Sequence, residues 1–198
     1  MRSRLLCLVL AGLVVAAPAA LALAAPVANP AERLVDLPID DEAYDHATDC
    51  RKRPSAGALA LVDWLEANAA GESWGIMRCE RWGKGRASLH AEGRAVDWHL
   101  DARLAADRRE ARRLIDLFLA TDSAGNERAL ARRMGIQELI WNCRSWWSGS
   151  DGTEPYSGCF TEPGARRRGV SPTAAHRDHI HIGLSRAGAR KRTSFWAR

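Results

Sequence analysis

Two segments of the chain alternate apolar and polar residues with the period of two that is typical of strands. They cover residues 94–100 and 179–184. Their polar members include Asp97, His99, His179 and His181. Because successive side chains of a strand point to opposite faces of a sheet, the apolar residues of both segments can enter a core while the polar ones face the other way. The chain therefore needs a sheet with acidic and imidazole groups on one face.

Helical patterns are interspersed among the strands without a regular strand–helix–strand rhythm. Apolar residues at helical spacing predict helices over 55–69, 104–120 and 126–134. Further strands are predicted over 74–82 and 136–141. Residues 144–172 are rich in Gly, Ser, Pro and Arg, which predicts a long loop. This mixture predicts a single α+β domain.

The first 24 residues have the composition of a signal peptide. Arg2 and Arg4 precede an uncharged apolar run over 5–23, and small residues favour cleavage after Ala24, with Ala22 as a second choice. An uncleaved anchor is the alternative, because the run approaches the length that spans a bilayer. We expect a secreted protein with a flexible lead-in over 25–50, one domain over 51–198 and no transmembrane segment after cleavage.

Four cysteines remain once the leader with Cys7 is removed. They are Cys50, Cys79, Cys143 and Cys159. An even number of cysteines in an exported chain predicts two disulfides, for which three pairings are possible. The pairs Cys50–Cys79 and Cys143–Cys159 are favoured because they close separate local loops. A four-thiolate zinc site is the alternative, but such sites usually use CxxC pairs, and the sequence contains none.

The charge of the chain is only weakly basic after cleavage. The leader holds two of the 29 basic residues and none of the 24 acidic ones, which leaves a net charge of +3. Short basic clusters such as 166–168 are typical of solvated surface. With no nucleic-acid-binding motif in the sequence, we expect no nucleic-acid partner, and we expect a monomer.

The polar residues of the two alternating segments are suited to zinc. His179 and His181 lie on one face of a strand, roughly 6.5–7 Å apart, so one can bind a metal while the other acts as a base. Asp97 is presented in the same way, and a turn at Gly93 can fold His90 back towards it. Three ligands would leave one position for water. His46 has no comparable setting, and His99 is interpreted as a polar residue at a strand end.

The residues of these segments also resemble a known family. The motif SxHxxGxAxD from Ser88 to Asp97, followed by a late HxH, resembles the signature of the lysostaphin, D-Ala-D-Ala metallopeptidase and Hedgehog superfamily. The run from His176 to His181 is similar to that of bacterial murein endopeptidases. The resemblance covers roughly residues 55–185 in element order and implies a small antiparallel sheet with helices packed on it.

The resemblance also implies residue roles. The zinc ligands would be His90, Asp97 and His181. The catalytic residue would be His179, or Asp178, which stands where carboxypeptidase-like members have a glutamate. Arg78, Arg81 and Arg86 are candidates for binding substrate, and Arg86 is preferred because it is closest to the motif. Ser88 and His176 are expected to bind substrate or to support the site.

The implied function is a secreted zinc metallopeptidase that acts on peptidoglycan or other peptides, of the D,D-carboxypeptidase or murein endopeptidase type. A non-catalytic zinc-stabilised binding module is the alternative, because Hedgehog domains use the scaffold for signalling. The position where those domains carry a glutamate is Ala175 in this chain.

Overall fold

The computed structural model describes residues 35–161 and 164–197, so the predicted signal peptide, its cleavage site and Cys7 lie outside the described residues. The elements in chain order are α1 (Ala56–Asn68), β1 (Glu72–Gly75), β2 (Arg81–Gly83), β3 (Arg86–Ala87), β4 (Ala95–His99), α2 (Ala105–Leu119), α3 (Ala129–Met134), β5 (Ile136–Trp141), β6 (Arg144–Trp147), β7 (Glu154–Pro155), β8 (His179–Leu184) and α4 (Arg186–Ala189). Mixed helix and sheet confirm the α+β class.

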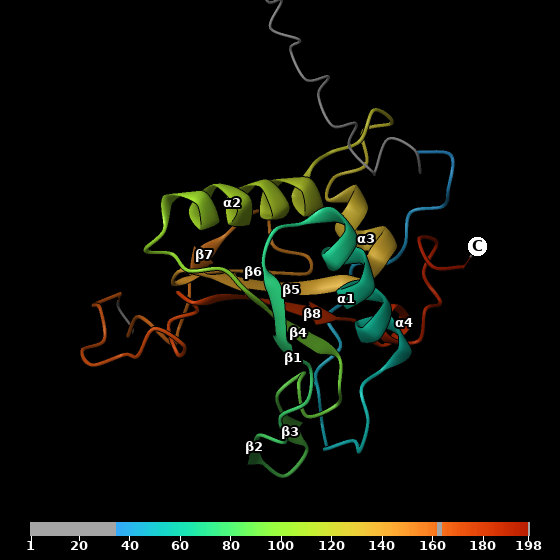
Figure 1. Cartoon of the computed structure of the whole chain (residues 1–198). Coiled ribbons are helices and arrows are strands. Elements are labelled where there is room, and N and C mark those ends of the chain that lie inside the picture. Colours follow the sequence, from blue (N-terminus) through green and yellow to red (C-terminus); the bar gives the residue numbers. More distant parts are fainter. Residues whose placement is uncertain (1–34, 162–163, 198) are drawn as a thin grey trace, which may run out of the picture.

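A six-stranded antiparallel sheet forms the centre of the molecule (Figure 1). Its strand order is β1-β4-β8-β5-β6-β7, so β8, the last strand in sequence, pairs with β4 on one side and β5 on the other. In this register Asp97 lies opposite His181, and His99 lies opposite His179. The two alternating segments of the sequence are therefore neighbouring strands.

The helices α1, α2 and α3 cover one face of the sheet (Figure 1). The apolar side chains of the strands meet them there in the main core. Its strand residues include Val96, Trp98, Leu139, Trp141, Ile180 and Ile182, and its helix residues include Leu61, Leu65, Leu114, Phe118, Leu130 and Met134. The opposite face, with the polar residues, is thereby left for the site.

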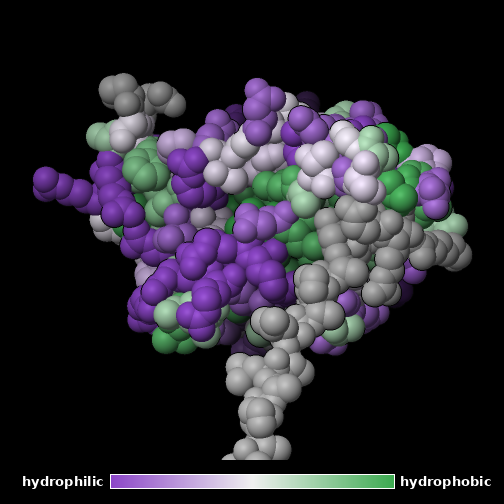
Figure 2. Space-filling view, turned by 90° about the horizontal axis from the view of Figure 1, so that it is seen from above, coloured by the Kyte–Doolittle hydropathy of each residue, from purple (hydrophilic) through white to green (hydrophobic). Residues whose placement is uncertain are grey.

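The outer face of α2 is solvated. Viewed from above, the surface over this helix is strongly hydrophilic (Figure 2). The exposed residues of α2 there include Arg109, Arg112, Arg113 and Asp116, whereas Ala111, Leu114 and Phe118 are buried. This division confirms the amphipathic pattern that predicted the helix.

Local capping sets the ends of two helices. The Ser55 hydroxyl accepts a hydrogen bond from the Ala58 N–H and caps α1. Gly135 ends α3 with φ +72°, and a Cβ there would lie 2.5 Å from the Gly188 Cα. A side chain at this position would be strained by its backbone and would clash, so only glycine fits.

Two predicted elements differ from the structure. The strand predicted over 74–82 is divided between β1 and β2, because the segment between them leaves the sheet, where the Ile76 carbonyl bonds His90 and Cys79 forms a disulfide. The loop predicted over 144–172 contains β6 and β7, which extend the sheet by pairing with β5 and with each other. Tertiary pairing overrides the weak local signals of such short strands.

The described part of the expected lead-in, residues 35–50, is attached to the domain. The Asp45 carbonyl accepts hydrogen bonds from Arg94 at 2.9 Å and from Gln137 at 3.1 Å, and Leu37 and Ile39 pack against the main core. The three prolines of 25–48 predicted a loosely packed segment. These long-range hydrogen bonds instead hold residues 35–50 against the domain.

The two disulfides are Cys50–Cys79 and Cys143–Cys159, which confirms the pairing predicted from loop locality. Two disulfides fit an extracellular protein. Within the described residues, no helix combines the length and apolar character needed to span a membrane.

A fully buried ion pair joins α3 to the loop before it. Arg133 Nη1 lies 2.8 Å from Asp122 Oδ2, and both side chains are 0% exposed. Replacing Arg133 with alanine would leave a buried carboxylate without its counter-ion, so we expect a loss of about 3–5 kcal/mol in the free energy of unfolding. Urea denaturation followed by circular dichroism measures this loss.

The matched control for this prediction is Arg112→Ala, which removes an exposed arginine from α2. We expect its free energy of unfolding to change by less than about 0.5 kcal/mol. A similarly small change in Arg133→Ala would contradict a stabilising role for the buried pair.

Candidate metal centre and cleft

Three potential metal ligands meet on the face of the sheet opposite the helices. The pairing of β4 with β8 places Asp97 Oδ1 3.2 Å from His181 Nδ1. His90 Nε2 lies 3.0 Å from each of these two atoms. All three residues are buried, and their ligand atoms form a group that could hold a metal ion. The structure thus brings together the three residues that the motif predicts as ligands.

The turn of the SxHxxGxAxD motif positions His90. Gly93 has φ +66°, and a Cβ there would lie 2.7 Å from the Arg53 carbonyl oxygen. The Ser88 hydroxyl accepts a hydrogen bond from the Ala91 N–H, so Ser88 supports the turn. The turn directs His90 towards β4. The Nδ1 atom of His90 bonds the carbonyl oxygen of Ile76, which follows β1, at 2.8 Å. This glycine is therefore required by the close approach of two backbone segments.

The donor set fits a cation. The Ile76 carbonyl can only accept, so His90 Nδ1 carries the proton and Nε2 presents a lone pair to the group. Burial would raise the pKa of Asp97, but the adjacent His181 and His90 lower it well below its usual range. Asp97 is therefore a carboxylate. Lone pairs that converge at 3.0–3.2 Å repel one another unless a cation lies between them, and two imidazoles with one carboxylate are typical zinc ligands.

The second histidine of the HxH motif lies beside this group. His179 Nε2 is 3.5 Å from Asp97 Oδ1, and its Nδ1 bonds Asp178 Oδ1 at 2.8 Å. The other oxygen of Asp178 accepts a hydrogen bond from Thr173 at 2.6 Å. Both oxygens of Asp178 are thus hydrogen-bonded, one to Thr173 and the other to Nδ1 of His179. Nδ1 is the ring nitrogen that does not approach Asp97. Asp178, predicted as a rival base, holds His179 instead of facing the ligands.

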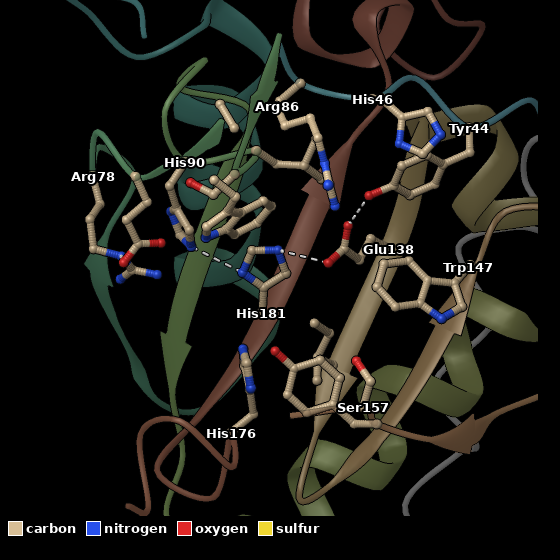
Figure 3. A pocket seen from close by; sticks show the side chains of 18 of the residues that line it. Tyr44, His46, Arg78, Arg86, His90, Glu138, Trp147, Ser157, His176 and His181 are labelled. Atoms are coloured by element: carbon tan, nitrogen blue, oxygen red, sulfur yellow. Dashed lines mark hydrogen bonds and ion pairs between the residues drawn. The ribbon is translucent and has the colours of Figure 1, made fainter. Parts of the chain in front are cut away.

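A cleft of about 740 Å³ opens over His90 and His181 (Figure 3). Its lining includes Tyr44, His46, Arg78, Arg86, Ser88, Glu138, Trp147, Tyr156 and His176. Three predicted substrate-binding residues, Ser88, Arg86 and His176, therefore line it. His179 and Asp178 are not part of the lining, and His179 is 2% exposed.

The arginines near the motif have different settings. Arg78 Nη1 lies 3.2 Å from Asp97 Oδ2, and its Nε pairs with Glu80. Arg81, another candidate, pairs with Asp49 at 2.5 Å and is not part of the cleft lining. The side chain of Arg86 extends into the cleft (Figure 3). Arg78 and Arg86 both belong to the cleft lining, but Arg78 is already paired with Asp97 and Glu80.

His176 occupies a strained position beside the site. Its φ is +49°, its ring centre lies 4.8 Å from that of His179, and its buried Nδ1 has no hydrogen-bond partner in the described residues. Burial, with the nearby His181 and His179, lowers the pKa of His176 to about 2. It is therefore a neutral imidazole at the edge of the cleft.

Three residues of the cleft were not assigned from the sequence. His46, which showed no functional setting in the sequence, lines the cleft next to Tyr44, with ring centres 4.9 Å apart. Tyr44 and Glu138 were not identified at all, and they are hydrogen-bonded to each other beside His181. Glu138 follows an apolar–polar pattern that any strand shows, so the sequence held no specific signal for it.

A comparison with protein families assigns the chain to one of them. The family model described as VldE, C-terminal domain, matches residues 51–176, which is more than half of the chain. The chain belongs to the VldE C-terminal domain family. No curated protein and no solved structure shows a significant similarity to it. The matched region of this VldE C-terminal domain includes His90, Asp97 and Glu138 but ends before His179 and His181.

Proposed function

We propose that this protein is a secreted zinc-dependent peptidase that acts on peptidoglycan peptides, with a Hedgehog/DD-peptidase-like fold. One observation carries the proposal. The ligand atoms of His90, Asp97 and His181 converge at 3.0–3.2 Å beneath a cleft large enough for a peptide. The proposal includes membership of the lysostaphin, D-Ala-D-Ala metallopeptidase and Hedgehog superfamily, which rests on the two sequence motifs.

The residues around the cleft have distinct roles in this proposal. His90, Asp97 and His181 would hold zinc, which would supply a Lewis acid for the scissile carbonyl and lower the pKa of a water molecule. His179 donates its Nδ1 proton to Asp178, so its Nε2 is free to accept a proton next to Asp97. The base is therefore His179, and Asp178 is a positioning residue.

Arg86 is the feature of the cleft that favours an anionic peptide. Arg86 forms no ion pair within the part of the chain that the structure describes, and its side chain extends into the cleft (Figure 3). Trp147 and Tyr156 add aromatic surface to the lining. Stem peptides of peptidoglycan carry free carboxylates, which arginine binds well. This supports peptidoglycan peptides as the substrate class.

Incubation of the zinc-loaded protein with purified muropeptides, followed by mass spectrometry of the products, tests the proposal. New peptide fragments that disappear after chelation and return with zinc are expected. The fragment masses identify the bond that is cut. Intact muropeptides in every condition, with zinc bound, would contradict a peptidase acting on this class.

A zinc-stabilised binding module is the second candidate. It is favoured by the engagement of both other carboxylates at the site, since Asp178 bonds His179 and Thr173, and Glu138 bonds Tyr44. In this case calorimetry would detect muropeptide binding that depends on zinc, without hydrolysis.

A further inference from the structure

Glu138 projects from β5 into the space beside His181. Its side chain is 9% exposed, and its Oε1 lies 3.5 Å from His181 Nε2 (Figure 3). Its backbone partner on β8 is Gly183, where an added Cβ would lie 3.0 Å from the Glu138 Cβ and 2.3 Å from Leu89 Cδ1. The absence of a side chain at Gly183 leaves the room in which Glu138 reaches the metal-ligand histidine.

The second oxygen of this carboxylate, Glu138 Oε2, accepts a hydrogen bond from the Tyr44 hydroxyl. Burial and the neighbouring Glu138 raise the pKa of Tyr44 well above its usual range, so the phenol keeps its proton and acts as the donor. Glu138 is thereby fixed on one side, and its Oε1 remains directed at His181.

The chemistry of histidine links this contact to the metal site. A neutral imidazole carries its proton on one nitrogen and a lone pair on the other. A carboxylate only accepts hydrogen bonds, so it favours the His181 tautomer with the proton on Nε2. The lone pair then lies on Nδ1, the atom 3.0 Å from His90 Nε2 and 3.2 Å from Asp97 Oδ1.

From this geometry we infer that Tyr44 and Glu138 form a positioning pair that fixes the tautomer and orientation of His181 and so raises the affinity of the site for zinc. The inference rests on the proposed zinc site but not on peptidase activity. Carboxylates that receive the second N–H of a ligand histidine tune metal sites in this way. Tyr44 comes from the segment before the first disulfide cysteine, so that segment completes the metal centre.

Zinc affinity measured by competition with a chromophoric chelator tests the inference. We expect Glu138→Ala to weaken zinc binding about 10–100-fold. Glu138→Gln keeps an acceptor oxygen for His181 and should recover most of the lost affinity. Tyr44→Phe, which releases Glu138 without removing it, should weaken binding by a smaller factor than Glu138→Ala.

The tautomer of His181 gives a second readout. Long-range proton–nitrogen correlation spectra distinguish a proton on Nε2 from one on Nδ1. The zinc-loaded wild type should show the Nε2–H form for His181. Metal-free Glu138→Ala should show a mixture of forms, whereas metal-free wild type and Glu138→Gln keep the Nε2 proton.

Glu154→Ala is the matched control, because it removes an exposed glutamate from β7 of the same sheet. Its zinc affinity should equal that of the wild type. If Glu138→Ala folds and binds zinc as tightly as the wild type, the positioning role is wrong. If Glu138→Gln loses hydrolysis while Glu138→Ala keeps full zinc affinity, Glu138 acts on the substrate instead, which also overturns the inference.

These results separate the inference from the proposed function. A wild-type protein that binds no stoichiometric zinc would overturn the zinc site itself. Zinc binding with unchanged affinity in Glu138→Ala would overturn only the positioning pair. Zinc binding that depends on Glu138, without muropeptide cleavage, would support the pair and leave the binding module as the function.

Discussion

Replacing His181 with alanine is expected to weaken zinc binding by more than about 100-fold. Loss of a residue that only hydrogen-bonds to a metal ligand usually weakens metal binding by about 10–100-fold, so the loss of a ligand itself should cost more. The change removes one of three ligands from the buried group and leaves His90 and Asp97, which cannot hold zinc tightly alone. Chelator competition measures the affinity. Zinc present at 100 times its Kd stabilises a fold by about 2.7 kcal/mol, so added zinc should raise the Tm of the wild type but not that of the variant.

His46→Ala is the control for this experiment. His46 lines the same cleft and is exposed, but it does not belong to the ligand group. It should retain one zinc per chain. If His181→Ala also retained one zinc per chain at the wild-type affinity, the assignment of the metal site would be wrong.

Replacing His179 with alanine should lower kcat by roughly 10²–10⁴-fold, the usual contribution of a general base, while zinc stays bound. His179 is 2% exposed and presents Nε2 next to Asp97, so its loss removes the proposed proton acceptor without removing a ligand. Steady-state kinetics on a muropeptide, together with zinc analysis of the same sample, measures both effects.

Asp178→Asn tests how His179 is positioned. The amide keeps the shape of the carboxylate but can donate a hydrogen bond to Nδ1, which favours the tautomer with the proton on Nε2 and blocks the base. We expect kcat to fall while KM changes little, because Asp178 is not part of the cleft lining. Asp151→Asn, at an exposed carboxylate, is the control and should leave kcat unchanged. Full activity in Asp178→Asn would exclude the proposed role of the Asp178–His179 pair.

The two variants probe different halves of the site. His181→Ala should remove metal and activity together, whereas His179→Ala should remove activity alone. A protein that functions as a binding module would lose ligand binding in His181→Ala but retain it in His179→Ala. The pair of results therefore distinguishes the two candidate functions.

Much of the fold could be predicted from the pattern of side chains. The alternation in 94–100 and 179–184 placed Asp97 and His181 on one face, because a strand directs every second side chain to the same side. Helical spacing located α1 and α2 to within one residue at each end. The disulfides followed from the short loops that they close, with sequence separations of 29 and 16 between the paired cysteines.

Other parts depended on contacts between segments far apart in the chain. Sequence spacing placed Asp178 and His179 in competition for one role, since both lie close to His181. The structure places the two side chains differently, because Asp178 precedes β8 and bonds Nδ1 of His179, whereas Nε2 of His179 lies next to Asp97. The short strands β6 and β7 likewise depend on pairing, of β6 with β5 and of β7 with β6.

The sequence by itself identified the candidate ligand group: strand periodicity, a glycine turn and the two motifs pointed to His90, Asp97 and His181. Only the tertiary structure revealed the surroundings of that group. Tyr44 and Glu138 are 94 residues apart and carry no motif, yet the packing of the N-terminal segment against β5 joins them beside His181. Candidate ligands can be identified from strand and turn patterns, whereas the hydrogen bonds that orient a ligand depend on which distant segments fold against it.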